Sequence, residues 1–280
     1  MKEIVRELIK GSVDFHIHIS PDPYRERIAD AYEVTFQAKK LGMKGIVLKS
    51  HDYPTVPLAQ LAQKNVEGIE VIGSLTLNDG VGGINPKAVE VSAKMGARVV
   101  WMPTLSSLNE GRSKGIERGI YILGENGQVL PEVIEVLALI KEFDLVLCTG
   151  HVSKEEITAL LSEARSMGIA KFVISHPLKV AGISVSLDLQ KKWTERGAFI
   201  EHCFVVTTAL SERLEPNAIA EAVRFVGAER CILSTDFGQL RNPPPWEGIQ
   251  IMLTTLLQCG LSEKQLKILV KDNPCQLLNL

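Results

Sequence analysis

Two histidines lie one residue apart inside an apolar run near the start of the chain. Residues 14–20 read DFHIHIS, which puts His16 and His18 at positions i and i+2. Side chains alternate across a β-strand, so both imidazoles would project from the same face. A lone histidine in a strand is more often a hydrogen-bonded core residue. The paired spacing instead favours two ligands of one metal ion.

The remaining histidines follow strand-like runs in the same way: His51, His151, His176 and His202. We expect each at or just past the carboxyl end of a strand, where the active sites of α/β barrels are built. His151 and His176 would come from neighbouring strands. Asp236, in LSTDFG, would end the last strand, which barrel closure places beside the first. Asp236 should therefore lie next to the His16–His18 pair.

Four imidazoles (His16, His18, His151 and His176) and the Asp236 carboxylate would form a nitrogen and oxygen donor set. That set suits Zn²⁺, Mn²⁺, Fe²⁺ or Ni²⁺ better than Ca²⁺ or Cu⁺, and zinc is the expected ion. Such an ion lowers the pKa of its bound water towards ~7 and polarises a substrate oxygen. Asp236 could accept the proton of the attacking water while it also contacts the metal.

Lys49 and Glu201 are charged residues inside apolar strands, where an unpaired charge is costly. Lys49 could be carbamylated and bridge two metal ions, bind an anionic substrate, or pair with a neighbouring acid. Glu201 is a less certain metal ligand and a second candidate bridge. Strand alternation prevents Glu201 and His202 from both facing the interior. We expect Glu201 to face inward and leave His202 as either a core or a site residue.

Four further residues are candidates around this set. His51, just past the second strand, could reach a second metal or the substrate. Asp14 would share the face of the His16–His18 pair one layer deeper, and we expect it to orient a ligand histidine. Arg112 and Arg241 fall on loops at the expected mouth of the site. Surface arginines are usually only solvated, and these two are candidates for binding a substrate carboxylate or phosphate.

The elements that must position these residues alternate between β and α patterns. Eight apolar, Val- and Ile-rich runs read as buried parallel strands: 12–19, 45–50, 69–77, 98–104, 145–150, 171–176, 198–204 and 231–238. The intervening segments carry helix signals, such as Asn85 before Pro86 and the capping-box spacing of Ser153 and Glu156. This pattern predicts an α/β fold, a single (β/α)8 TIM barrel over residues 1–280.

Three features complete the fold prediction. Residues 1–11 read as a short amphipathic helix without the features of a signal peptide, and a helical tail follows from residue 262. Residues 105–130 interrupt the alternation, with a tight turn at ENGQV, and are a candidate lid over the site. A doubly wound open sheet is the alternative to the barrel.

Composition limits the classes of partner. The 280 residues carry a formal net charge of −2, which favours neither nucleic acid nor an anionic membrane. No stretch approaches the roughly 18 to 20 apolar residues of a membrane span. The five cysteines are scattered without a CxxC motif, as expected of free thiols in a reducing cytosol. We expect a cytoplasmic protein with a small-molecule substrate. The sequence does not fix its oligomeric state, and a homo-oligomer is one of the alternatives.

The set of His16, His18, His151, His176 and Asp236, in this order along the chain, resembles the metal site of the amidohydrolase superfamily. The closing segment KDNPCQLLNL is also similar to the last helix of that superfamily. The resemblance implies that these five residues are metal ligands and that Asp236 is the general base. Residues 101–104 (WMPT) lack the Lys or Glu with which two-metal members bridge their ions. One ion, or two ions bridged by Lys49 or Glu201, would fit.

Three function classes follow. The first is a hydrolase that uses a metal-activated water to cleave an amide, lactone or related ester bond of a small molecule. The second is a metal-dependent phosphoesterase of the polymerase-and-histidinol-phosphatase type or the TatD-like nuclease type. The third is a metal-dependent decarboxylase, or a sensor that binds metal without turnover.

Overall fold

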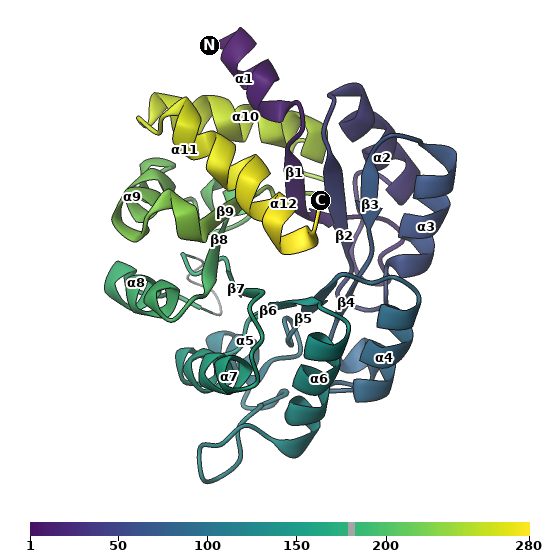
Figure 1. The fold of residues 1–280 in the computed structure, drawn as a ribbon, viewed down its shortest axis with the longest axis vertical. Coiled ribbons are helices and arrows are strands. Elements are labelled where there is room, and N and C mark those ends of the chain that lie inside the picture. The colour runs from purple at the N-terminus through teal and green to yellow at the C-terminus, as the bar shows by residue number, and fades with distance from the viewer. Residues whose placement is uncertain (179–182) are drawn as a thin grey trace. The chain divides into compact units, whose positions relative to one another are not determined.

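The computed structural model describes residues 1–178 and 183–280 and has an α/β fold, in which short strands alternate with helices (Figure 1). This confirms the α/β alternation predicted from the sequence. The chain divides into two compact units. The first unit comprises Met1–Lys49, Pro57–Gly73 and Glu201–Leu280, and the second comprises Ser50–Val56 and Ser74–Ile200.

The first unit places the His16–His18 pair between two neighbouring strands. Strand β1 (Val13–His18) pairs in parallel with β2 (Gly45–Lys49), which pairs in parallel with β3 (Glu70–Ile72). On its other side β1 meets the segment that follows β9 (Cys231–Ser234). The amide of Asp236 donates to the carbonyl oxygen of His16 at 2.9 Å, and that of His18 donates to Phe237 at 2.8 Å. Strand β8 (Phe199–Cys203) enters this unit at Glu201 and neighbours β9.

Helices surround these strands, and the predicted helices at both ends of the chain are confirmed. The helices of this unit are α1 (Lys2–Ile9), α2 (Ala31–Lys40), α3 (Val56–Asn65), α9 (Asn217–Val226), α10 (Pro245–Gln258), α11 (Glu263–Lys267) and α12 (Asn273–Leu278), with the 3-10 helices η2 (Phe204–Thr207) and η3 (Ala228–Arg230) and the π-helix η4 (Ile268–Asp272). Helix α1 packs on α10. The Asn273 side chain donates to the carbonyl oxygens of Ala228 (2.9 Å) and Cys231 (2.6 Å), which ties the tail to the start of β9.

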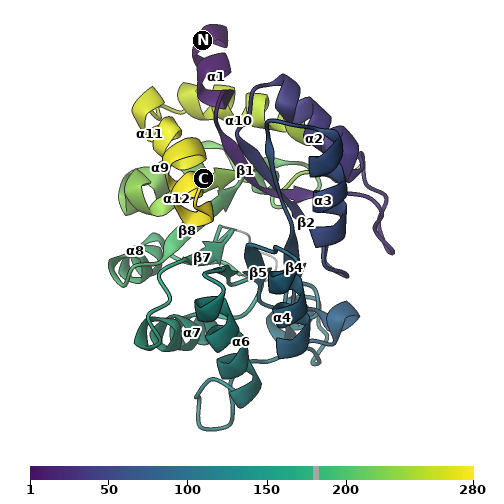
Figure 2. The same cartoon turned by 45° about the vertical axis from the view of Figure 1, so that its right-hand side comes forward.

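The second unit contains four parallel strands in chain order: β4 (Ser74–Thr76), β5 (Val99–Trp101), β6 (Val146–Cys148) and β7 (Phe172–Ser175). Its helices are η1 (Asp79–Val81), α4 (Pro86–Lys94), α5 (Leu108–Ser113), α6 (Pro131–Glu142), α7 (Lys154–Ser166) and α8 (Leu187–Glu195). Helices α4 and α6 lie side by side (Figure 2). The predicted cap at Asn85 and the capping box of Ser153 and Glu156 are confirmed.

Two predicted segments differ from the structure. The run 69–77 is not one strand, because it breaks at Gly73 into β3, which pairs with β2, and β4, which pairs with β5. Glycine inside a strand pattern commonly marks such a break. The segment 105–130 contains helix α5, which was not predicted. Its predicted tight turn is confirmed by an antiparallel bridge between Leu123 and Val129.

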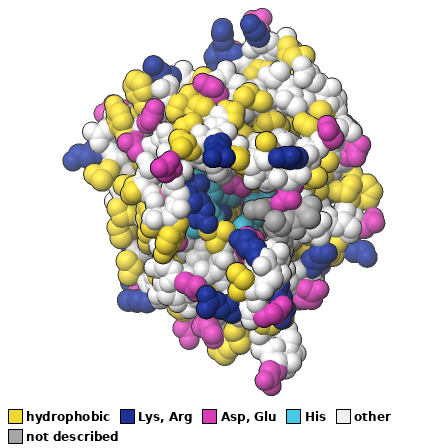
Figure 3. Space-filling view, turned by 180° about the vertical axis from the view of Figure 1, so that it is seen from behind, with side chains coloured by type: hydrophobic (Ala, Val, Ile, Leu, Met, Phe, Trp, Pro, Cys, Tyr) yellow, Lys and Arg dark blue, Asp and Glu magenta, His cyan; other side chains and the backbone are white. Residues whose placement is uncertain are grey.

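The strands are buried as predicted for a parallel sheet. Every side chain of β1, β2 and β4 to β9 is buried, which leaves charged strand residues such as Lys49 and Glu201 in the interior. None of the described helices is long and apolar enough to cross a membrane. On the face seen in Figure 3, acidic and basic side chains are interspersed and histidine side chains are visible.

Candidate metal centre

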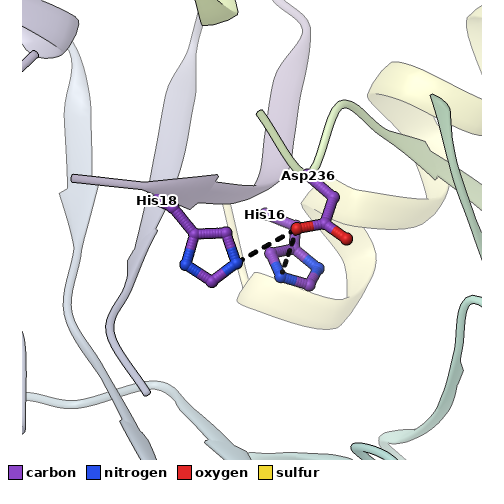
Figure 4. A group of neighbouring side chains, drawn as sticks. All are labelled: His16, His18 and Asp236. Atoms are coloured by element: carbon purple, nitrogen blue, oxygen red, sulfur yellow. Dashed lines mark ion pairs between the residues drawn. The ribbon is translucent and has the colours of Figure 1, made fainter. Parts of the chain in front are cut away.

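His16, His18 and Asp236 converge in the first unit, as the sequence predicted. Oδ1 of Asp236 lies 3.1 Å from Nε2 of His18 and 3.3 Å from Nε2 of His16. Figure 4 shows both rings directed at the same carboxylate oxygen. All three residues are buried. Two imidazole nitrogens and a carboxylate oxygen within this distance form a donor set suited to a divalent transition metal.

Local irregularities of the backbone produce this convergence. The register between β1 and β2 shifts between Asp14 and Ile17, so His16 lies at a β-bulge or related irregularity, a feature that re-aims side chains near active sites. Asp236 follows β9 in the left-handed region, at φ 54°. Such a conformation is unfavourable for a residue other than glycine and persists where surrounding contacts impose it. Hydrogen bonds between β1 and residues 235–237 supply those contacts.

The other nitrogen of His16 faces Glu201. Nδ1 of His16 lies 3.0 Å from Oε1 of Glu201, and the Ser234 hydroxyl donates to the same oxygen at 2.6 Å. Sγ of Cys203 lies 3.7 Å from Nδ1 of His16. Burial, with the negative charges of Glu201 and Asp236, raises the pKa of the Cys203 thiol well above its usual value. Glu201 thus contacts the nitrogen of His16 opposite the one near Asp236.

Lys49 reaches the same cluster from β2. Its Nζ lies 3.0 Å from Nε2 of His16, and the side chain is almost completely buried. Burial lowers the pKa of His18 well below its usual value, and the charges of Arg27 and Lys49 lower it further. The hydrogen bond to Asp236 acts in the opposite direction and raises this pKa. His18 is therefore held neutral, which is the form that binds a metal ion.

Asp14 contacts the backbone around the cluster. Its Oδ1 accepts hydrogen bonds from the amides of Thr235 (3.0 Å) and His16 (3.3 Å), and its Oδ2 accepts one from the Thr235 hydroxyl at 2.6 Å. Burial raises the pKa of Asp14 to about 6, against the lowering effect of these hydrogen bonds. Asp14 was predicted to orient a ligand histidine. The contacts show it joining β1 to the turn that carries Asp236.

His151 and His176 lie together in the second unit. Their ring centroids are 4.8 Å apart, with the planes close to perpendicular. Nδ1 of His151 lies 3.0 Å from Oε2 of Glu110, whose Oε1 lies 2.7 Å from Nζ of Lys114. His176, like Asp236, has a positive φ, of 32°. The two imidazoles thus form a second cluster of potential metal ligands.

His51 belongs to a separate network in the second unit. Its Nδ1 lies 2.8 Å from Oγ1 of Thr104, and Asn78 donates to that hydroxyl at 2.7 Å and to the His51 carbonyl oxygen at 3.0 Å. Oδ1 of Asn78 accepts from the Thr104 amide at 2.8 Å. This network holds the His51 ring in one orientation.

The remaining candidates lie outside these clusters. His202 is buried, its two ring nitrogens have no hydrogen-bond partner among residues 1–178 and 183–280, and burial lowers its pKa to about 4. A neutral core histidine fits these facts. Arg112 is 57 % exposed and pairs with Glu117, with 2.9 Å between Nε and Oε2. Arg241 is exposed.

Ser234 and Glu110 are among the contacting residues that the sequence did not reveal. Ser234 is two residues before Asp236 in LSTDFG, and nothing in its type marks it. Glu110 carried a usable signal, because SLNE at 107–110 has the spacing of a capped helix start. In the structure the Ser107 hydroxyl accepts the Glu110 amide at 3.1 Å. A predicted helix there would have placed Glu110 on an ordered element.

Comparisons with known proteins agree with this architecture. A family model described as "Family of unknown function (DUF6282)" matches residues 11–201, more than half of the chain. No curated protein sequence matches the chain. An amidohydrolase from Pseudomonas aeruginosa is similar in structure, with a TM-score of 0.68, 14 % identity and 98 % of each chain covered.

Two further solved structures are similar. The probable dipeptidase PvdM from Pseudomonas aeruginosa has a TM-score of 0.70 and 12 % identity, over 99 % of this chain and 97 % of that one. A protein described as a 2-pyrone-4,6-dicarboxylic acid hydrolase, from Pseudomonas putida, has a TM-score of 0.65 and 16 % identity, over 96 % and 97 %. The resemblance to amidohydrolases expected from the sequence is confirmed at the level of the fold.

Proposed function

This chain belongs to the family of unknown function DUF6282, and we propose that it is a metal-dependent hydrolase that cleaves an amide, lactone or related ester bond of a small molecule. The observation that carries the proposal is the approach of two buried imidazole nitrogens to one carboxylate oxygen. Nε2 of His16 and Nε2 of His18 lie 3.3 and 3.1 Å from Oδ1 of Asp236. The amidohydrolase-like fold supports the same reading.

The residues present fit a divalent ion. Glu201 would accept from Nδ1 of His16, 3.0 Å away, and this would leave the ring's lone pair on Nε2, facing Asp236. A carboxylate behind a ligand histidine is a common support of metal sites. Oε2 of Glu201 is also buried without a hydrogen-bond partner among the residues the structure describes. A buried carboxylate oxygen of that kind is costly unless a group completes it.

His16, His18 and Asp236 would hold the ion, and Zn²⁺ is the ion that this donor set favours. When bound, the ion would activate a water molecule and polarise the bond to be cleaved. Asp236 would accept the proton of the attacking water and pass it to the leaving group. Glu201 would keep His16 in the required orientation, and Asp14 would fix the turn that aims Asp236.

We further propose that the strands close into the (β/α)8 barrel expected from the sequence. Closure would bring His151 and His176, which follow β6 and β7, to the same ion or to a second one. The amidohydrolase-like neighbours support this arrangement. Lys49 would remain a cation beside the ion, and His51 would face the substrate. Arg112 and Arg241 would then contribute only through the outer loops.

Metal analysis of the purified protein tests the proposal first. We expect one or two equivalents of a divalent transition metal by mass spectrometry, and anomalous scattering at the absorption edge to place one beside His16, His18 and Asp236. The His16→Ala/His18→Ala variant should lose that ion while retaining its far-UV circular dichroism. A folded wild-type protein that takes up no Zn²⁺, Mn²⁺, Fe²⁺ or Ni²⁺ would refute the proposal.

A substrate panel then separates the reaction classes. The protein loaded with Zn²⁺ or Mn²⁺ should hydrolyse members of a set of lactones, p-nitrophenyl esters and dipeptides. Activity confined to p-nitrophenyl phosphate and bis(p-nitrophenyl) phosphate would instead indicate a phosphoesterase. Release of CO₂ from aromatic carboxylates would indicate a decarboxylase.

A further inference from the structure

We propose that Glu110 is a positioning residue for His151, and that helix α5 holds both the ring and the backbone of that histidine. The inference rests on the proposed function in one respect, because it takes His151 to be a metal ligand. The contacts between Glu110 and His151 lie within the second unit. Glu110 and His151 are 41 positions apart in sequence and both are buried.

Glu110 contacts the imidazole ring of His151. Oε2 of Glu110 lies 3.0 Å from Nδ1 of His151, and Oε1 of Glu110 lies 2.7 Å from Nζ of Lys114. An ionised Glu110 carboxylate, paired with Lys114, can only accept hydrogen bonds. The proton of a neutral His151 must then be on Nδ1, and its lone pair on Nε2. Glu110 therefore selects the tautomer of His151 that can bind a metal ion through Nε2.

The backbone of His151 is held by hydrogen bonds at both its carbonyl oxygen and its amide. The carbonyl oxygen of His151 accepts from the Ser107 hydroxyl at 3.1 Å and from the Asn109 side-chain amide at 2.9 Å. The amide of His151 donates to the Pro103 carbonyl oxygen at 2.9 Å. Ser107 is also the N-cap of α5, through the amide of Glu110. One short helix start thus fixes His151 at its carbonyl oxygen and at Nδ1.

The same kind of histidine–glutamate contact occurs in each of the two units. His16 in the first unit and His151 in the second both have Nδ1 on a buried glutamate, at 3.0 Å in each case. The glutamates come from different contexts, Glu201 from strand β8 and Glu110 from a helix that interrupts the β/α alternation. The same chemical arrangement at two histidines argues that it serves their Nε2 atoms. The segment 105–130, expected to be a lid, would then orient His151, a proposed metal ligand.

The tautomer can be measured directly. Long-range ¹H–¹⁵N NMR spectra of the metal-free protein distinguish Nδ1–H from Nε2–H imidazoles, and only six histidines contribute. The His151→Gln variant assigns the His151 signals. We expect the Nδ1–H form in the wild type. Glu110→Gln places an amide that can donate to Nδ1, so the signals should shift towards the Nε2–H form, with Zn²⁺ affinity lowered about 10- to 100-fold.

Glu117→Gln is the matched control in the same segment. Glu117 is 74 % exposed, pairs with Arg112 and should leave both the tautomer and the Zn²⁺ affinity unchanged. A wild-type His151 with its proton on Nε2 would overturn the inference, and that measurement requires no variant of Glu110 to fold. An unchanged tautomer and affinity in Glu110→Gln would overturn it as well. Failure of the wild type to bind metal would refute the proposed function and leave the tautomer result standing.

Discussion

The ammonium nitrogen of Lys49 lies 3.0 Å from Nε2 of His16, with both side chains almost completely buried. Nδ1 of His16 lies 3.0 Å from Oε1 of Glu201, and with the ring proton on Nδ1 the Nε2 atom would accept from Lys49. The same nitrogen lies 3.3 Å from Asp236 in the candidate metal centre. A metal ion bound by His16 would therefore meet a cation at close range, and Lys49 becomes a determinant of metal affinity.

Replacing Lys49 with Met should tighten divalent metal binding by at least about tenfold. Two unit charges about 4 Å apart interact by about 4 kcal/mol at an effective dielectric constant of 20, so removal of one cation favours another. Isothermal titration calorimetry with Zn²⁺ measures the change. Weaker binding in Lys49→Met would show instead that the amine, or a carbamate formed on it, is itself a ligand.

Asp236→Asn should lower turnover about 10²- to 10⁴-fold, the range associated with loss of a general acid or base. The amide preserves the size of the side chain, so the far-UV circular dichroism should be unchanged. The measurement is kcat on the best substrate of the hydrolase panel. Asp188→Asn, on the exposed surface of α8, serves as control. Retained activity in Asp236→Asn would remove this carboxylate from the mechanism.

Glu201→Gln and Cys203→Ser should separate two groups that both face Nδ1 of His16. Glu201 makes a 3.0 Å contact, whereas the Cys203 sulfur lies at 3.7 Å. We expect Glu201→Gln to weaken Zn²⁺ binding about 10- to 100-fold and Cys203→Ser to change it by less than about threefold. Competition with a fluorescent chelator measures both affinities. The reverse order would make the thiol, and not the carboxylate, the group that matters for metal binding.

Gly238→Ala should destabilise the fold more than Gly127→Ala. Gly238 has φ 136°, and a Cβ there would collide with the carbonyl group of His18. Gly127, with φ 73°, has open space around its added Cβ. The strain of a left-handed alanine alone costs roughly 1–2 kcal/mol, so the clash should add to that figure at Gly238. Urea unfolding measures the free energy of unfolding of both variants. Equal losses of stability would show that β1 can move to accommodate the added methyl group at Gly238.

Much of the fold could be predicted because its signals are local. Buried parallel strands read as continuous Val- and Ile-rich runs, and the caps at Asn85 and Ser153 depend on residues three positions apart or fewer. The break at Gly73 was missed because the run 69–77 is apolar on both sides of it. The alternation of strand and helix shows where strands lie, but not that β3 and β4 pair with different neighbours.

The site divides in the same way between local and long-range information. The paired spacing of His16 and His18, and the place of Asp236 after the last strand, could be read from residue order and parallel topology. The contacts of Glu110 with His151 could not, because helix α5 brings them together across 41 positions. The lone pairs of His16 and His151 depend on such contacts, since an imidazole is directed by the group on its other nitrogen.

The sequence by itself determined the α/β alternation and the candidate ligands, because periodicity and residue type are properties of short segments. Only the tertiary structure decided which atoms of those ligands face one another. The register shift in β1, the left-handed turn at Asp236 and the glutamates behind His16 and His151 result from packing between distant segments. Side-chain direction at a buried site is set by those long-range hydrogen bonds, which no local pattern encodes.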